Sequence, residues 1–466
     1  MHYLSTRGEA PVLGFCDAVL AGLARDGGLY LPQTWPQIDA DEIAGFANRP
    51  FAEVAFAILS RFTGGEIPDA VLKDICASAF ATFRHPSTAP IVELEPGHFV
   101  LELWHGPTLA FKDVAMQVLA RLMDHILGQR GKKATIVGAT SGDTGSAAIE
   151  AFRGRENTDI VILHPEGRTS AIQRLQMTTV LDANVHNIAL KGTFDDCQTL
   201  VKGLFNNHAF RDRVRLSGVN SINWGRIVAQ IVYYFTAAVA LGAPYRKVSF
   251  TVPTGNFGDI FAGYCAKQMG LPIDRLVIAT NANDILRRTL ETGRYEKQGV
   301  AATQSPSMDI EISSNFERLL FDAQDRDAAA TARQMASLGQ SGGFAVPEAA
   351  LARMRRDFSA GTTGEQETAQ VIRDVHERAG YVVDPHTAVG IGVARGHLDR
   401  ATPMITLSTA HPAKFPDAVR AATGEAPVLP GWLADLPQRP ERVTVLENDP
   451  AVVEDFILAR TRARED

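Results

Sequence analysis

Leu101-Glu-Leu-Trp-His-Gly-Pro-Thr-Leu-Ala-Phe-Lys112 is the stretch of sequence that decides the expected fold. It overlaps an apolar, strand-like run from His98 to Leu103 that stops at Gly106-Pro107, and apolar residues then recur at helical spacing from Val114 to Leu127. Lys112 is therefore predicted at the start of a helix. Burial there favours a neutral amine, which can attack a carbonyl group and form a Schiff base. A lysine that extends to the surface explains this stretch better when it is taken alone, so the chemical interpretation depends on the other loops.

The composition is typical of a soluble globular protein with two or three domains. The chain has 466 residues, of which 45% are hydrophobic and 21% are charged. The net charge of -7 and the pI near 6.0 argue against general binding to nucleic acids or anionic membranes. We expect no secretory signal in residues 1–10 and no membrane span. The four cysteines are far apart, which indicates reduced thiols of a cytoplasmic protein and no metal site.

Beyond residue 98, strand-like and helical patterns alternate along the chain. The strand-like runs are 134–137, 160–163, 185–190, 248–252, 275–279, 404–407 and 443–446. Short connections between them predict an α/β fold with a mostly parallel sheet flanked by helices. Ligands bind at the carboxyl ends of the strands in such folds, and the polar loops of this chain lie there. Residues 1–93 are expected to be mainly helical, and 316–380 to be helices and loops outside the sheet.

The loop Thr254-Gly-Asn-Phe-Gly-Asp259 lies between a predicted strand and a predicted helix. Its two glycines let backbone N–H groups converge, and the helix start adds partial positive charge. Such a loop can hold a phosphate without any Lys or Arg. It is neither a Walker loop nor the six-residue dinucleotide pattern. A glycine turn with Asp259 as helix N-cap explains the loop at least as well.

The loop Thr140-Ser-Gly-Asp-Thr-Gly145 has the same strand–loop–helix setting. A helix N-terminus with free N–H groups and the side chains of Ser141, Asp143 and Thr144 suits a carboxylate ligand. An ordinary capped turn is an equally good explanation of this loop.

Two further loops carry polar side chains that can face the same crevice. Segment 220–226 contributes Ser221, Asn223 and Arg226, and an arginine can bind a phosphate through two parallel hydrogen bonds. A loop with a surface arginine remains the simpler interpretation of that segment alone. Segment 408–415 follows a predicted strand and offers the Thr409 hydroxyl, with His411 and Lys414 as candidate charges, although a solvated loop explains both charges as well.

In combination and in this order, these segments resemble the threonine synthase family. The matching segments are 103–113, 139–145, 221–226, 254–259 and 408–415, with 3–8 and 26–32 near the start of the chain. The resemblance covers nearly the whole chain and is weakest over 316–380. It implies a pyridoxal-phosphate enzyme of fold type II, which is the tryptophan-synthase-β-like fold. The domains implied are an N-terminal mainly helical segment (1–93), a large cofactor-binding domain (94–112 and 216–466) and a smaller mobile domain (113–215).

The resemblance also implies a role for individual residues. Lys112 would be the Schiff-base lysine, and Thr409 would face the pyridine nitrogen of the cofactor. The remaining cofactor-binding residues would be Asp113, Gly255, Asn256, Phe257, Gly258 and Asp259, with 255–258 around the phosphate. The substrate carboxylate would meet Ser141, Asp143 and Thr144. The substrate phosphate would be held by Ser221, Asn223 and Arg226.

The activity implied is the conversion of O-phospho-L-homoserine and water to L-threonine and phosphate, the last step of threonine biosynthesis. A phospho-lyase that eliminates phosphate without making threonine is the nearest alternative, followed by an amino-acid dehydratase. A non-catalytic sensor of a phosphate ligand is an alternative of another class. We expect a small-molecule substrate, no nucleic-acid or membrane partner, and a monomer or homodimer in the cytoplasm.

Overall fold

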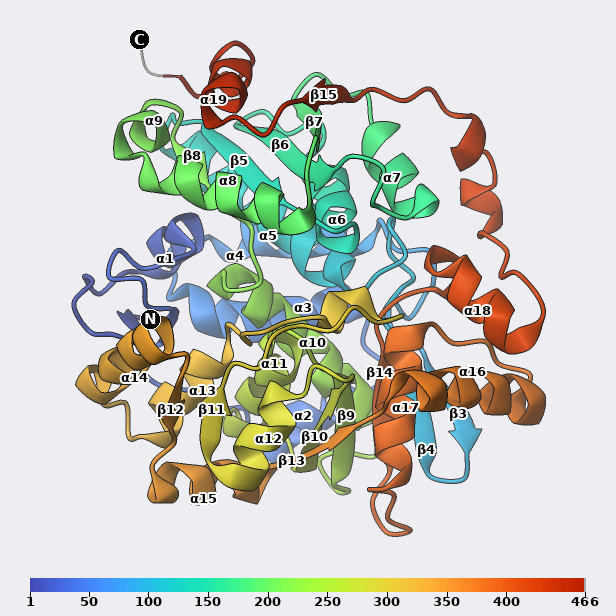
Figure 1. Ribbon diagram of the computed structural model, residues 1–466. Helices are drawn as coiled ribbons and strands as arrows, with labels where there is room; N and C mark the ends of the chain where they lie inside the picture. Colours follow the sequence, from blue (N-terminus) through green and yellow to red (C-terminus); the bar gives the residue numbers. More distant parts are fainter. Residues whose placement is uncertain (465–466) are drawn as a thin grey trace.

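Two parallel-rich sheets form the framework of the computed structural model, which describes residues 1–464 (Figure 1). The larger sheet has the strand order β13-β10-β9-β14-β4-β3, and only the β3–β4 pair is antiparallel. Its strands are β3 (Ile91–Glu95), β4 (His98–Glu102), β9 (Val248–Pro253), β10 (Ile273–Thr280), β13 (Phe358–Thr362) and β14 (Met404–Ser408). The carboxyl ends of β4, β14 and β9 therefore lie side by side.

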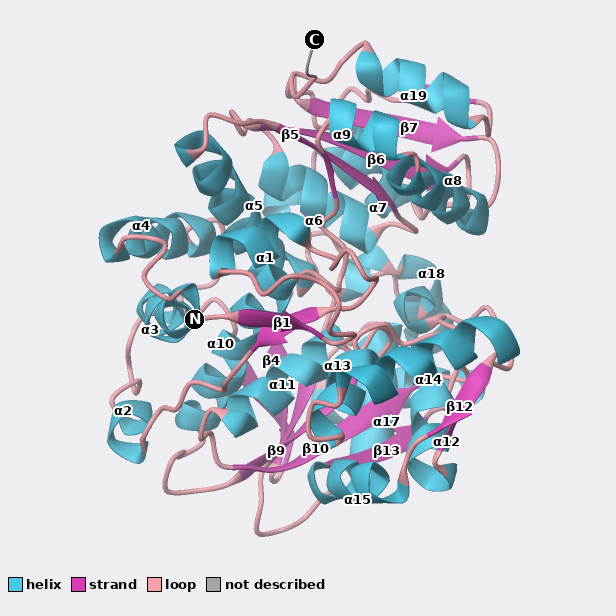
Figure 2. Ribbon diagram, turned by 90° about the vertical axis from the view of Figure 1, so that its left-hand side faces the viewer, coloured by secondary structure: helices cyan, strands magenta, loops and turns pink. Residues whose placement is uncertain are grey.

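The smaller sheet has the order β15-β7-β6-β5-β8, and all its neighbouring strands are parallel. Its strands are β5 (Ala134–Ala139), β6 (Thr158–Pro165), β7 (Val185–Leu190), β8 (Leu216–Ser217) and β15 (Thr444–Leu446). It lies above the larger sheet in Figure 2, and α5 (Lys112–Gln129) and α6 (Asp143–Phe152) lie between the two sheets. The prediction of an α/β fold with parallel sheets flanked by helices is confirmed.

Both faces of the larger sheet are covered, because side chains alternate between the two faces of a strand. On β10, Leu276 and Ile278 belong to the main core, which includes α10 (Trp224–Ala240) and α11 (Gly258–Gln268). Val277 and Ala279 face α17 (Pro385–Arg395) on the other side. The smaller sheet is covered on its outer face by α8 (Phe194–Asn206), α9 (His208–Arg213) and α19 (Pro450–Leu458).

Residues 1–93 wrap around the large core. They form a small antiparallel sheet of β1 (Tyr3–Ser5) and β2 (Tyr30–Pro32). Their helices are α1 (Phe15–Ala21), α2 (Ala40–Ala44), α3 (Phe51–Thr63) and α4 (Asp69–Phe80). Among the helices of residues 1–464, none combines the length and the apolar character that crossing a membrane requires.

The expectation that 316–380 lies entirely outside the sheet was wrong for β13. This strand pairs with β10 at the edge of the larger sheet. Its sequence, Phe-Ser-Ala-Gly-Thr, has few of the β-branched residues that mark a strand. Its Gly361 fits because a Cβ at this position would lie 2.7 Å from Cγ1 of Val393. The predicted turn at 341–344 is confirmed, since Gly342 ends α14 in a left-handed conformation (φ +81°).

The other elements of 285–423 surround that edge and the strand ends. They are α12 (Ile285–Thr292), β11 (Arg294–Glu296), η1 (Pro306–Met308), α13 (Phe316–Ala323), α14 (Ala328–Ser341), β12 (Gly343–Ala345), α15 (Glu348–Asp357), α16 (Glu365–Ala379), η2 (Pro412–Lys414) and α18 (Pro416–Thr423). A long segment with η3 (Gly431–Leu433) and η4 (Leu436–Gln438) then leads back to the smaller sheet (Figure 1).

The sheet pairing differs from the expected division in which all of 216–466 belongs to the large domain. β8 pairs with β5, and β15 pairs with β7, so both edges of the smaller sheet come from outside 113–215. The C-terminal segment is fixed there by an ion pair between Arg462 Nε and Asp159 Oδ1 at 2.7 Å. A strand of three residues carries no sequence signal for the sheet that it joins. Movement of residues 113–215 stays a prediction.

Candidate active site

Lys112 is buried at the edge where the strands of the larger sheet end. The segment after β4 bridges the segment after β14, and the Phe111 N–H donates to the Thr409 carbonyl at 2.8 Å. Helix α5 begins at Lys112, whose residue surface is only 8% exposed. Burial lowers the pKa of the Lys112 amine, the Asp143 carboxylate raises it, and the nearby cations Lys414 and Arg226 lower it again. The net shift is downward, which favours the neutral amine that the sequence pattern predicted.

The turn at 255–258 has the properties of a phosphate cradle. Within residues 1–464, the N–H groups of Gly255, Asn256, Phe257 and Gly258 donate to no protein acceptor. A Cβ built on Gly255 would lie 2.7 Å from the Ser307 carbonyl oxygen, so only glycine fits there. Four unpaired donors at the start of α11 need an acceptor other than protein, and a phosphate group provides several.

Neighbouring segments hold this turn in place. Phe257 has a left-handed backbone (φ +64°), and its ring packs between Phe316 and Phe358. The Asn315 amide donates to the carbonyls of Asn256 (2.9 Å) and Ser221 (3.3 Å). The same asparagine therefore ties the turn to the segment that carries Arg226.

Thr409 follows β14 directly and is buried. Its backbone N–H donates to the Thr387 hydroxyl at 3.3 Å. The Thr409 hydroxyl has no hydrogen-bond partner in the described part of the chain, which leaves it free for a ring nitrogen of a ligand.

The loop at 140–145 ends in the N-terminus of α6. Its Thr140 hydroxyl accepts from the N–H groups of Gly142 and Gly145, both at 2.9 Å. The N–H groups of Ser141, Asp143 and Thr144 have no acceptor within residues 1–464. These three donors agree with the predicted carboxylate site.

The side chain of Asp143 is directed away from that carboxylate role. Asp143 Oδ2 lies 3.3 Å from Lys112 Nζ, and Oδ1 lies 3.0 Å from Lys414 Nζ. Burial alone would raise the pKa of Asp143, but the two lysines outweigh it and hold this pKa well below its usual range. An ionised carboxylate repels a substrate carboxylate, so only the backbone N–H of Asp143 suits that ligand.

Arg226 is a buried cation for which residues 1–464 provide no anionic partner. It lies near the start of α10 and is 4% exposed. Its Nη1 donates to the Val219 carbonyl at 3.3 Å, whereas its Nε is buried and has no hydrogen-bond partner in residues 1–464. Burial lowers the pKa of the guanidinium to about 10. An unpaired buried cation is costly, so this position is suited to an anionic ligand.

The other two residues predicted around the substrate phosphate, Ser221 and Asn223, differ in how their side chains are used. The Ser221 hydroxyl makes no hydrogen bond within the described residues and remains available. The Asn223 side chain caps α10, accepting from the Gly225 N–H and donating to the Val19 carbonyl, both at 2.9 Å. These bonds give Asn223 a structural role, and its contact with a phosphate stays a prediction.

The carboxylates of Asp113 and Asp259 are engaged inside the protein. Asp113 accepts from the N–H and the hydroxyl of Thr108, at 2.8 and 2.6 Å, and burial raises its pKa to about 6. Asp259 accepts from the hydroxyls of Tyr233 and Tyr234, and burial raises its pKa to about 7. Asp259 Oδ2 is buried and has no hydrogen-bond partner within residues 1–464. Contact of either residue with the cofactor stays a prediction.

Some residues of the site carried little signal in the sequence. Gln173 and Gln176, on α7 (Ala171–Thr178), contact Asp143 and Lys414. Their spacing of three residues puts both side chains on one face of the helix, and this spacing was the only sequence signal that they act together. The Ser307 hydroxyl lies 3.4 Å from Asp143 Oδ2. Neither Ser307 nor Asn315 carried a sequence signal for the site. No group of His, Cys, Asp and Glu among the described residues has an arrangement that could hold a metal ion.

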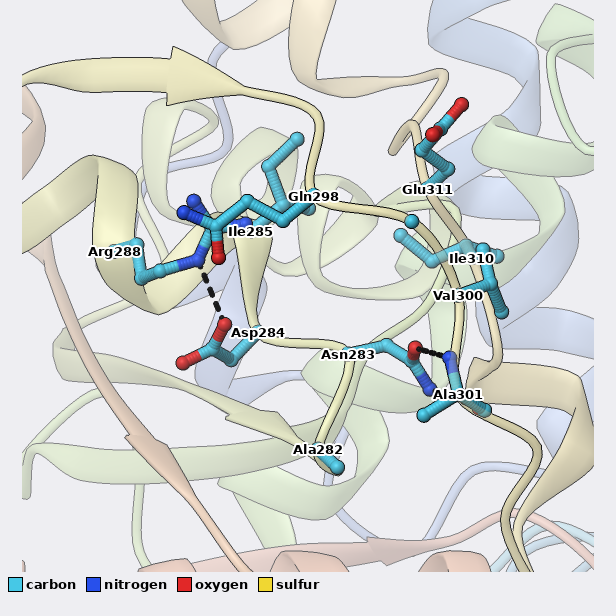
Figure 3. A pocket seen from close by; sticks show the side chains of 11 residues that line it. Ala282, Asn283, Asp284, Ile285, Arg288, Gln298, Val300, Ala301, Ile310 and Glu311 are labelled. Carbon is cyan, nitrogen blue, oxygen red and sulfur yellow. Dashed lines mark hydrogen bonds and ion pairs between the residues drawn. The ribbon is translucent and has the colours of Figure 1, made fainter.

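A pocket of about 320 Å³ lies elsewhere, between α12 and residues 298–311 (Figure 3). Its Arg288 is already paired with Asp284, at 2.8 Å, and its Asn283 accepts from the Ala301 N–H at 2.8 Å. Arg288 and Asn283 are thus engaged by neighbouring protein groups, and no residue that lines this pocket is hydrogen-bonded to Lys112 in the part of the chain that the structure describes. The buried strand ends around Lys112, with their unpaired donors, are the candidate active site.

Comparisons with known proteins agree with this geometry. A family model described as pyridoxal-phosphate dependent enzyme matches residues 85–409, and models for the N terminus and the C-terminal part of threonine synthase match 2–80 and 387–457. The threonine synthase of Pseudomonas aeruginosa is 51% identical over 459 residues, which cover 98% of each chain. This chain belongs to the threonine synthase family.

Solved structures of the threonine synthase family extend the match to three dimensions. A pyridoxal-phosphate-bound threonine synthase from Brucella melitensis superimposes with a TM-score of 0.98 and 62% identity, over 99% of this chain and 100% of that one. The yeast threonine synthase gives 0.94 and 41%, over 98% of both chains. The predicted family, fold type II and cofactor are confirmed: the protein is a pyridoxal-phosphate-dependent lyase.

Proposed function

We propose that this threonine synthase converts O-phospho-L-homoserine and water to L-threonine and phosphate. The observation that supports this most strongly is a pair of anion sites around one buried amine. The free N–H groups of 255–258 suit the cofactor phosphate, and the unpaired Arg226 suits a second phosphate. A dehydratase acting on a phosphate-free amino acid has no use for the second site.

The residues present fit the cofactor. We propose that Lys112 attaches it, that 255–258 hold its phosphate, and that Thr409 faces its ring nitrogen. When bound, the cofactor supplies an electron sink for negative charge that develops on the substrate carbons. The protein supplies orientation and proton transfers.

Each remaining part of the site has a task in the proposed reaction. The neutral amine of Lys112 removes the proton from the substrate Cα. It would pass that proton on to the conjugated system that the bound cofactor supplies, and the amine, neutral again, could then take a proton from Cβ. The N–H groups of Ser141, Asp143 and Thr144 orient the substrate carboxylate. Arg226 and the Ser221 hydroxyl bind the phosphate as it leaves Cγ, where negative charge grows, and water then adds at Cβ. Closure of residues 113–215 over the candidate active site would exclude stray water.

We also place this step at the end of threonine biosynthesis in the cytoplasm. The four cysteines, at 16, 76, 197 and 265, are buried free thiols, as a reducing compartment allows.

Product analysis of the purified enzyme tests the proposed reaction. Cofactor-loaded protein is mixed with O-phospho-L-homoserine, and threonine and phosphate are both measured over time. Equal amounts of the two products are expected. Phosphate without threonine would instead support the phospho-lyase alternative, and the absence of both would reject the substrate.

The cradle at 255–258 gives a first testable substitution. Gly255→Ala places a Cβ 2.7 Å from the Ser307 carbonyl, so the turn must shift and its N–H groups diverge. Overpacking of this kind costs roughly 1–3 kcal/mol, and we expect about 10- to 100-fold weaker cofactor binding in an absorbance titration. Gly203→Ala is the matched control, because its Cβ would meet no atom within 4 Å. Equal affinities of the two variants would contradict the cradle.

A further inference from the structure

Lys414 is a fully buried lysine whose ammonium group is completely satisfied. Its residue surface is 0% exposed. Its Nζ lies 2.7 Å from the Thr108 carbonyl oxygen, 3.0 Å from Gln176 Oε1 and 3.0 Å from Asp143 Oδ1. All three are acceptors, so the group needs all three of its protons. The proposed reaction leaves this buried charge without a task.

Asp143 connects that cation to the reactive amine. Its Oδ1 accepts from Lys414 and from Gln173 Nε2 (2.8 Å), and its Oδ2 faces Lys112 Nζ at 3.3 Å and the Ser307 hydroxyl at 3.4 Å. One carboxylate is thus shared between two lysines. Each oxygen is held from two sides, so the carboxylate cannot rotate without losing bonds.

Lys112 has few other polar neighbours. Asp143 is its single hydrogen-bond partner among the described residues. The charged groups that face it are Asp143 from α6, Lys414 from η2 and Arg226 from α10. His386 of α17 lies near Asp143 and helps to lower the pKa of that carboxylate. Besides its burial, one anion and two cations therefore set the charge environment of the Lys112 amine.

We propose that Lys414 is a positioning residue that holds the Asp143 carboxylate in place and shares its negative charge, so that Asp143 orients the Lys112 amine without fixing it as an ammonium ion. This inference rests on the proposed role of Lys112 as proton acceptor. A carboxylate facing Lys112 alone would stabilise its protonated form, whereas a carboxylate already neutralised by Lys414 does so much less.

The proposal makes opposite predictions for the two members of the pair. In Lys414→Met, Lys112 is the only lysine that still faces the Asp143 carboxylate, so the Lys112 amine becomes more basic. Asp143→Asn leaves the Lys414 charge uncompensated, so the amine becomes less basic. The double variant removes both charges, and its amine is expected between the two.

The test is the pH dependence of acetylation of Lys112 in the cofactor-free full-length chain, followed by peptide mass spectrometry. Only the neutral amine reacts. We expect the midpoint to rise by about one pH unit in Lys414→Met, a roughly tenfold loss of neutral amine below the midpoint, and to fall in Asp143→Asn. The acid limb of the kcat–pH profile of the loaded enzyme should move in the same directions. Lys247→Met removes an exposed lysine that lies 3.7 Å from Asp274, and serves as the control.

Shifts in the same direction, or none in either variant, would overturn the proposal and leave Lys414 a packing residue. Should Lys414→Met not fold, Lys414→Gln replaces it, because its amide can still donate to the Thr108 carbonyl, and an unchanged midpoint would again overturn the proposal. Borohydride reduction of the loaded wild-type enzyme separates the two hypotheses. Cofactor absent from Lys112 refutes the proposed function, whereas cofactor present with unmoved midpoints refutes this inference alone.

Discussion

Replacing Lys112 by alanine is expected to abolish turnover, with a loss of roughly 10³-fold or more in kcat. The side chain is both the proposed attachment point of the cofactor and the proposed proton acceptor, and no other described amine except that of Lys414 lies beside Asp143. Lys414 cannot substitute, because its three protons are already donated. The measurement is the release of threonine and phosphate by protein saturated with cofactor.

A matched control accompanies this substitution. Lys132→Ala removes an exposed lysine just beyond the end of α5 and is expected to leave turnover unchanged. Circular dichroism checks that both variants are folded. Near-normal turnover in Lys112→Ala would reject the assignment of this lysine.

Replacing Arg226 by alanine is expected to cost about 2–5 kcal/mol of substrate phosphate binding, which is roughly 30- to 5000-fold in affinity. The size follows from burial, because a guanidinium that is 4% exposed pairs with an anion in a poorly screened environment. The readouts are KM for O-phospho-L-homoserine and the inhibition constant of inorganic phosphate. Arg246→Ala, at an exposed arginine beyond the end of α10, is the control.

The same substitution has a second, independent readout. Because Arg226 Nε is buried without a partner, the ligand-free protein bears the cost of desolvating this charge. Arg226→Met, which fills similar volume, is therefore expected to melt at the same or a higher temperature than the wild type while binding phosphate more weakly. A lower melting temperature together with unchanged phosphate inhibition would show that Arg226 supports the fold and remove it from the site.

The sequence located the backbone of the site well. Lys112, the turn at 255–258 and Thr409 each follow a strand of one parallel sheet, and the carboxyl ends of neighbouring parallel strands meet at one edge. Alternation of strand and helix is a local pattern, so it is readable without knowing the strand order. The same reasoning explains why the free N–H groups of Ser141, Asp143 and Thr144 occur where a carboxylate site was predicted.

Side-chain direction was not readable in the same way. Asn223 and Asp259 are the residue types that bind phosphates or cap helices, but neighbours from α1 and α10 decide which of these each one does. Asp143 and Lys414, which form an ion pair, are 271 residues apart in the sequence, so no local pattern connects them. The edge strand β13 has few β-branched residues and β15 has only three residues, so their pairing depends on tertiary contacts.

The order of strands in the two sheets also bears on how the chain is made. β4 at 98–102 must wait for β14 at 404–408 before it has a parallel neighbour, and β7 gains its outer neighbour only from residues 444–446. Of the 466 residues, 403 are synthesised before the first residue of β14, Met404. The parallel pairing of β4, and with it the strand end that carries Thr409 next to Lys112, is therefore completed only late in translation.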